Sequence, residues 1–117
     1  MKVLVANAPA VFPLSDNYEK YFFRAGSRWP ASVVKKREEH ITEYLPFPFY
    51  LAYTTALLKK DNIETYAVDA IALNWSEDQF IDYVKEIRPD VLLMETTTPT
   101  VEKDVQIIQN IKAHLPK

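Results

Sequence analysis

The fold is decided by the stretch VLLMETTTPTVEKDVQIIQNIKAHLPK, residues 91–117. It opens with a short apolar run, which is typical of a buried strand in a parallel sheet. A block of threonines around Pro99 follows, and apolar residues then recur at the spacing of one helix face. The residues of that face are Val101, Val105, Ile108, Ile111 and Leu115. The stretch therefore predicts a strand, a hydroxyl-rich loop and a helix packed on the sheet.

Two further strands are predicted nearer the N-terminus. The apolar run from Val3 to Ala6 is compact, and Asn7 and Pro9 end it. Residues 64–70, ETYAVDA, form the second run. Both are short enough to be strands in a sheet core.

Two further helices are predicted as well. Residues 46–62 carry Pro48 near the first turn and two lysines near the end, and their apolar side consists of Tyr50, Tyr53, Leu57 and Leu58. Residues 76–90 begin with Ser76 as N-cap and end at Pro89. Between Pro9 and about Pro46 the apolar residues follow neither the helical nor the strand period, which predicts a long loop. Within it, residues 32–40 fit a short helix.

Alternating strands and helices predict an α/β fold of three layers, with a parallel, Rossmann-like (flavodoxin-like) sheet. We expect the strand order 2-1-3. Three strands make a thin sheet with an open apolar edge, so we expect residues 1–117 to be a single, truncated domain whose later strands are missing. A complete small domain is the alternative.

Composition excludes several classes of function. The formal net charge of -2 gives no basic surface for nucleic acid, and the lack of cysteine excludes disulfides, thiolate metal sites and iron–sulfur clusters in this stretch. A single glycine excludes the glycine-rich phosphate loops. No apolar run approaches the ~20 residues of a membrane span, so we expect a cytoplasmic protein.

The threonine block lies where ligands bind in open parallel sheets, outside the carboxyl ends of the strands. With the order 2-1-3, the loop Asn7–Pro9 and the loop Thr96–Thr100 are neighbours there. Their hydroxyls and N–H groups suit amides, phosphates or water. Alternatively, Thr98 or Thr100 caps the helix and the other threonines are strand residues. Asp69 ends the second strand, where it either binds a ligand or caps the next loop.

Four segments follow one another along the chain in an order that is typical of a known protein family: KVLVANAP, RWP, PFPFYLAYTTALLKKDNIETYAVDA and DVLLMETTTPT. In this order the chain resembles the N-terminal cobalamin-binding region of the cobalamin-dependent radical SAM family. That family includes methyltransferases and the anaerobic magnesium-protoporphyrin monomethyl ester cyclase group. The resemblance covers nearly the whole chain.

The resemblance implies a set of cofactor-binding residues. The two loops would supply Asn7, Pro9, Thr96, Thr97, Thr98 and Thr100 to the corrin amides or to the nucleotide tail. Arg28 and Trp29 would cover the corrin face or the substrate channel; alternatively, they anchor the loop. The Asp-x-His-x-x-Gly motif is absent around His40 and His114, so no histidine–cobalt bond is expected. His114 is expected to be solvated at a helix end.

The remaining chemistry is expected elsewhere. In such proteins the radical SAM half carries a Cys-x-x-x-Cys-x-x-Cys motif for its iron–sulfur cluster and binds S-adenosylmethionine, and this stretch has no cysteine. The fragment alone would therefore not be catalytic. Its expected partners are the corrinoid, the rest of its own chain, and a second copy paired through the open sheet edge.

Two other classes of function fit the same fold. One is a receiver- or flavodoxin-like interaction or signalling domain without a cofactor, although Asn7 and Ala8 stand where a receiver needs acidic residues. The other is a fragment of a nucleotide-sugar or glycosyl-transfer enzyme, which no residue specifically supports. Fold alone does not separate these classes.

Overall fold

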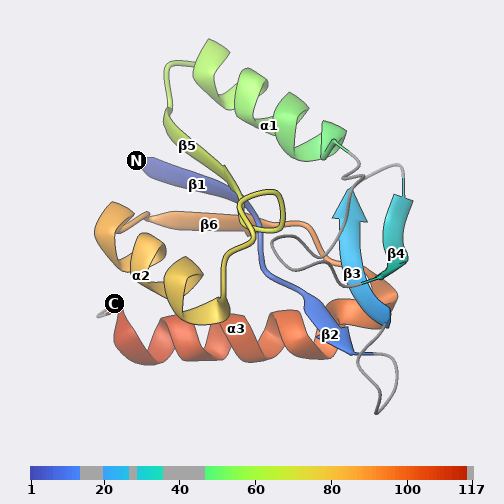
Figure 1. Cartoon of the computed structure of the whole chain (residues 1–117). Helices are drawn as coiled ribbons and strands as arrows, with labels where there is room; N and C mark the ends of the chain where they lie inside the picture. The colour runs from blue at the N-terminus through green and yellow to red at the C-terminus, as the bar shows by residue number, and fades with distance from the viewer. Residues whose placement is uncertain (14–19, 27–28, 36–46, 116–117) are drawn as a thin grey trace.

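The structure, a computed structural model, describes residues 1–13, 20–26, 29–35 and 47–115. Its centre is a parallel sheet of β1 (Lys2–Asn7), β5 (Glu64–Asp69) and β6 (Val91–Met94), in the order β5-β1-β6 (Figure 1). This confirms the predicted order 2-1-3 and the Rossmann-like α/β class.

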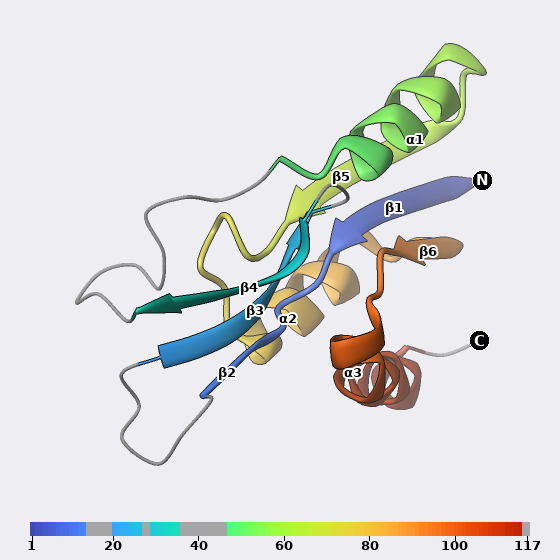
Figure 2. The ribbon, with the colours of Figure 1, turned by 90° about the vertical axis from the view of Figure 1, so that its right-hand side faces the viewer.

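Helices cover both faces of this sheet. Helix α1 (Phe49–Lys60) lies on one face, while α2 (Glu77–Ile87) and α3 (Val101–His114) lie on the other (Figures 1 and 2). A single 3-10 turn, η1 (Thr98–Thr100), leads into α3. The three-layer arrangement follows from the strand–helix alternation, since each crossover between parallel strands must pass over one face.

The core lies between the sheet and the α2/α3 layer. The register aligns Leu4 with Leu92 and Ala6 with Met94, so these side chains share the face toward α2 and α3. The side chains of Leu4, Phe80 and Ile107 are completely buried there. Val3 and Val5 point to the opposite face, under α1, and are 2% and 1% exposed.

Helix α2 forms as its sequence predicts. The Ser76 hydroxyl accepts a hydrogen bond from the Gln79 N–H at 3.2 Å, and the Gln79 side chain accepts one from the Ser76 N–H at 2.8 Å. This capping box satisfies two N–H groups that a helix start leaves open. Arg88 ends the helix in the left-handed region with φ 50°, directly before Pro89.

Helix α3 is rotated relative to the prediction. Val101 and Val105, predicted to face the core, are 43% and 46% exposed. Ile111 is buried, as predicted, but the other buried residues of this stripe are Thr100, Asp104 and Ile107. The prediction for the first turns was wrong because it counted only apolar residues, whereas hydrogen bonds hold a threonine and an aspartate against the sheet.

Helix α1 occupies the predicted segment but buries none of its side chains. Tyr50, Tyr53 and Leu57, predicted as its apolar packing side, are 65%, 67% and 59% exposed. Leu58, the fourth residue predicted on that side, is half-buried, and so are Leu51 and Thr55. The helix therefore lies on the sheet through a narrow side that contains few large residues.

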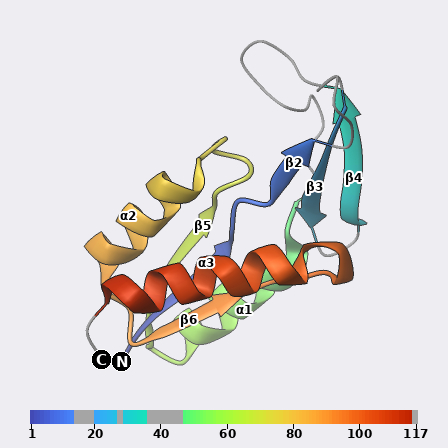
Figure 3. The ribbon, with the colours of Figure 1, turned by 90° about the horizontal axis from the view of Figure 1, so that it is seen from below.

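The predicted loop from 9 to 46 contains a second sheet. Strands β2 (Val11–Pro13), β3 (Lys20–Gly26) and β4 (Trp29–Lys35) form an antiparallel sheet in the order β2-β3-β4 (Figures 1 and 3). The prediction of a loop was wrong over these strands, and so was the short helix over residues 32–35. The sequences KYFFRAG and WPASVVK are rich in aromatic and β-branched residues, which favour strands once they can pair.

Helices α2 and α3 are joined by an ionic cluster on Glu77. Its carboxylate accepts hydrogen bonds from Lys103 Nζ and, at 2.7 Å, from Asn110 Nδ2. The hydrogen bond from Lys103 is the main reason why the pKa of Glu77 lies below its ordinary value of 4.5; burial opposes this shift, and Asn110 adds to it.

We expect this cluster to make stability depend on pH. Because the pKa of Glu77 is lower in the folded than in the unfolded chain, its contribution is complete above about pH 4.5 and is lost as the pH falls through the folded pKa. Urea unfolding at pH 7 and pH 3 measures how much the free energy of unfolding falls between the two pH values. This fall should be smaller for Glu77→Gln than for the parent chain. The exposed Glu102→Gln serves as control, and equal losses in all three chains would contradict the expectation.

Candidate ligand-binding site at the carboxyl ends of the strands

The carboxyl ends of β1, β5 and β6 meet at one end of the sheet, where ligands bind in folds of this kind. The N–H of Ala70 donates to Asn7 O at 2.9 Å, and the N–H of Glu95 donates to Ala6 O at 3.4 Å. The segments after β5 and β6 therefore start beside the segment after β1, as the sequence predicted for the loops of β1 and β6. The β2-β3-β4 sheet lies beyond the same end (Figure 1).

Asn7 and Asp69 connect the ends of β1 and β5. The Asn7 side-chain amide donates to Asp69 Oδ1 at 3.1 Å, and the same oxygen accepts from the N–H groups of Ile71 and Ala72, each at 3.1 Å. Asp69 thus caps the turn after β5, one of the two roles that its position suggested. Asn7 is only 1% exposed.

The segment after β1 is buried throughout. Ala8 and Ala10 are completely buried, and Pro9 is buried between them. A corrin could therefore touch Asn7 or Pro9 only if this segment opened. The sequence could not show this, because the burial arises from packing and not from a local pattern.

The threonine block is held together around Asp104, which is 2% exposed. Its Oδ2 accepts hydrogen bonds from the Thr96 hydroxyl at 2.5 Å and from the Thr100 hydroxyl at 2.9 Å. The Thr97 hydroxyl lies 2.9 Å from Thr100 Oγ1, which also accepts from the Thr97 N–H at 3.2 Å. Since Thr100 donates its one proton to Asp104, the geometry makes Thr97 the donor to Thr100.

This network assigns different roles to the four threonines. Thr100 is completely buried and lies at the start of α3, so its role is structural. Thr97 is half-buried and bonded inward. Thr96 and Thr98 are exposed residues at the carboxyl end of the sheet. The Thr96 hydroxyl donates its proton to Asp104, so it could meet a ligand only as an acceptor. Thr96 and Thr97 follow the end of β6 at Met94, so they are not strand residues.

Of the remaining residues considered in the sequence, Trp29 and His114 belong to the part of the chain that the structure describes. Arg28 lies outside the described residues, as does His40. Trp29 is the first residue of β4, and its backbone pairs with Gly26 of β3. His114 ends α3, exposed, with its Nδ1 2.7 Å from Asn110 O, as expected for a solvated residue at a helix end.

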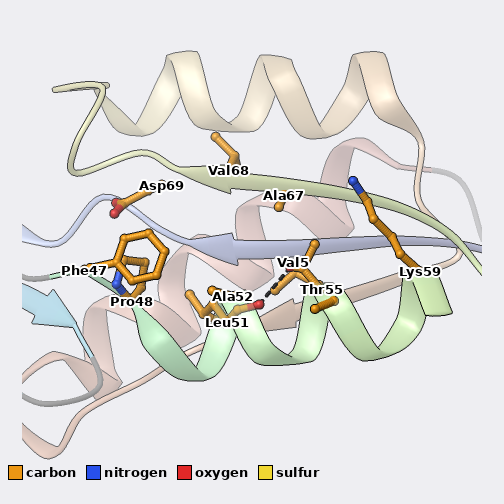
Figure 4. Close-up of a pocket in the computed structure, with 11 residues that line it drawn as sticks. Val5, Phe47, Pro48, Leu51, Ala52, Thr55, Lys59, Ala67, Val68 and Asp69 are labelled. Carbon is orange, nitrogen blue, oxygen red and sulfur yellow. Dashed lines mark hydrogen bonds between the residues drawn. The ribbon is translucent and has the colours of Figure 1, made fainter.

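Sequence reasoning missed a slot under α1. A cavity of about 450 Å³ lies between α1 and the strands β1 and β5 (Figure 4). The residues that line it are Val5, Phe47, Pro48, Leu51, Ala52, Thr55, Ala56, Lys59, Ala67, Val68 and Asp69. A signal was present, since the small residues Ala52, Thr55 and Ala56 recur on one side of a helix that otherwise carries large ones.

Within the described ranges, no group of three or more histidine, aspartate or glutamate side chains is placed to hold a metal ion. None of the helices described there combines the length and the apolar character needed to cross a membrane. Comparison of the sequence with protein-family models found no match, and comparisons with curated proteins and with solved structures found none either.

Proposed function

We propose that residues 1–117 bind cobalamin as the N-terminal module of a radical SAM enzyme. The observation that carries the proposal is the pair of exposed residues Thr96 and Thr98 at the carboxyl end of β6, beside the central strand of a 2-1-3 sheet. Corrin side chains end in neutral amides, which hydroxyl groups match better than charged groups do.

Cobalt would receive no imidazole from the described part of the chain. Helix α3 runs back along the sheet from the threonine block, so His114 lies at the opposite end of the molecule (Figures 1 and 3). Asp104 would act indirectly. By accepting from Thr96 it fixes the position of one of the two hydroxyls that would contact the cofactor.

The proposal extends to the whole enzyme. S-adenosylmethionine and an iron–sulfur cluster would bind to a separate radical SAM part, and the reaction would be methyl transfer or related radical chemistry in the cytoplasm. Trp29, the first residue of β4, is proposed to cover the corrin face or the substrate channel. Arg28 is proposed for the same role from its sequence position alone.

The test is retention of hydroxocobalamin, measured by visible absorbance after desalting. We expect Thr96→Val and Thr98→Val each to weaken binding by roughly two- to tenfold, the effect of one lost hydrogen bond. Thr54→Val, on the far side of the sheet, should bind as the parent chain does. A folded chain that retains no corrinoid would overturn the proposal.

A second candidate is an interaction or signalling domain of receiver-like or flavodoxin-like shape without a cofactor. The burial of Asn7 and Pro9 favours it, because a cofactor site at this sheet end would be expected to expose the loop after β1. The inward bonding of Thr97 and Thr100 points the same way. In the hydroxocobalamin experiment this candidate predicts a folded protein with no retained colour.

We also propose that a second copy pairs along β6. Strand β6, like β5, is an edge strand of the parallel sheet, and Val91 and Leu93 on its α1-side face are each 37% exposed. Sedimentation velocity should show a concentration-dependent dimer that Leu93→Lys removes. Leu73→Lys, at an exposed leucine outside the strands, should leave the dimer intact. A monomer at all concentrations would contradict this.

A further inference from the structure

The slot under α1 is unusual because it lies where a core would be expected. A helix that crosses a sheet normally buries an apolar stripe, yet the twelve residues of α1 include no buried side chain. Below the helix, Val5 of β1 forms an apolar floor. The helix and the sheet therefore leave between them a space, open to solvent, that their own side chains do not fill (Figure 4).

Small side chains create this space. Ala52, Thr55 and Ala56 line it from the helix, and Ala67 lines it from β5. The Thr55 hydroxyl donates to Leu51 O at 2.7 Å, so its polar group is already satisfied. The lining is thus apolar along the helix, and a volume of about 450 Å³ falls within the range of small-molecule sites.

Two charged residues lie at the ends of the slot. Asp69, at the carboxyl end of β5, already accepts from Asn7 and from two backbone N–H groups, so it is engaged in the fold. Lys59 lies at the other end, and its side chain reaches from α1 toward β5 (Figure 4). The ion pairs recorded within the described ranges use other lysines: Lys2, Lys85 and Lys103.

We propose that this slot binds an apolar carboxylate, such as a medium-chain fatty acid. The chain would lie between α1 and the sheet, and the carboxylate would pair with Lys59 Nζ. An apolar chain suits the lining, and an anion suits a lysine that no recorded ion pair within the described ranges engages. The site is separate from the threonine block and does not depend on cobalamin binding.

The experiment is calorimetric titration of the chain with decanoate. We expect one molecule to bind per chain, and Lys59→Met to weaken binding by about tenfold while keeping the apolar stem. Lys60→Met, at the next residue of the same helix, is the matched control and should bind within about twofold of the parent chain. Raised salt should weaken binding to the parent chain and much less to Lys59→Met.

A second variant tests the slot itself. Ala67→Leu places a larger side chain in the slot and should abolish decanoate binding while circular dichroism shows the chain folded. Binding that is unchanged in Ala67→Leu, or equal in Lys59→Met and Lys60→Met, would overturn the proposal, as would a folded parent chain that binds no decanoate. Displacement of decanoate by hydroxocobalamin would also overturn it, since the slot would then belong to the corrinoid site.

Discussion

Replacing Phe80 by alanine should destabilise the chain by about 3–5 kcal/mol, a large part of the about 5–15 kcal/mol that holds a domain of this size folded. Phe80 is completely buried and belongs to the cluster that joins α2 and α3 to the sheet. Its removal would leave a cavity at the centre of the only cluster of buried apolar side chains found among the described residues. Urea unfolding followed by circular dichroism measures the loss.

Tyr53→Ala is the control for this prediction. Tyr53 is also aromatic and helical, but it is 67% exposed, so its loss should change the free energy of unfolding by no more than about 0.5 kcal/mol. A loss of less than about 1 kcal/mol for Phe80→Ala would mean that α2 does not pack as the structure shows.

The second large effect is expected at Asp104. Asp104→Ala removes the acceptor of the Thr96 and Thr100 hydroxyls. The buried Thr100 hydroxyl then loses its 2.9 Å bond and, as a donor, keeps only the 3.3 Å contact with Thr97 O, which should cost about 1–3 kcal/mol. Glu102→Ala removes an exposed carboxylate from the same helix turn and should cost less than about 1 kcal/mol, since only the helix-dipole interaction is lost.

A double variant separates the structural from the functional role of the block. Thr100→Val combined with Asp104→Ala removes both partners of the buried bond, so it should regain part of the stability that Asp104→Ala loses. If the stability losses of Thr100→Val and Asp104→Ala simply add in the double variant, the hydrogen bond between these residues is not the source of the loss. In the folded double variant, weaker hydroxocobalamin retention would show that the position of Thr96 matters for the cofactor.

The parallel sheet and its helices could be predicted because their signals are local. Ser76 and Pro89 bound α2, and the apolar runs of β1, β5 and β6 are short and uninterrupted. The antiparallel sheet could not be predicted, because β3 and β4 become strands by pairing with each other and carry no strict alternation. Their aromatic and β-branched content was the available signal.

The candidate site was predicted in position but not in detail. The sequence indicated the threonine block and its place at the sheet end, and the structure divides it into buried and exposed residues. That division depends on Asp104, which lies eight residues beyond Thr96 and reads as an ordinary acid in the first turn of a helix. The slot under α1 was missed although its small residues Ala52, Thr55 and Ala56 share one side of the helix, because small side chains alone do not predict that the space beside them stays unfilled.

The central place of β1 has a consequence for the order in which the chain can fold as it is synthesised. Its contacts with β5 and with the start of β6 join residues that are far apart in the sequence. The hydrogen bond from Asn7 to Asp69 spans 62 positions, and the one from Lys2 to Asp90 spans 88. Strand β1 leaves the ribosome before β5 and β6, so it must wait for both of them before it has its two neighbours. Until then its apolar edges are open to chaperones or to other nascent chains.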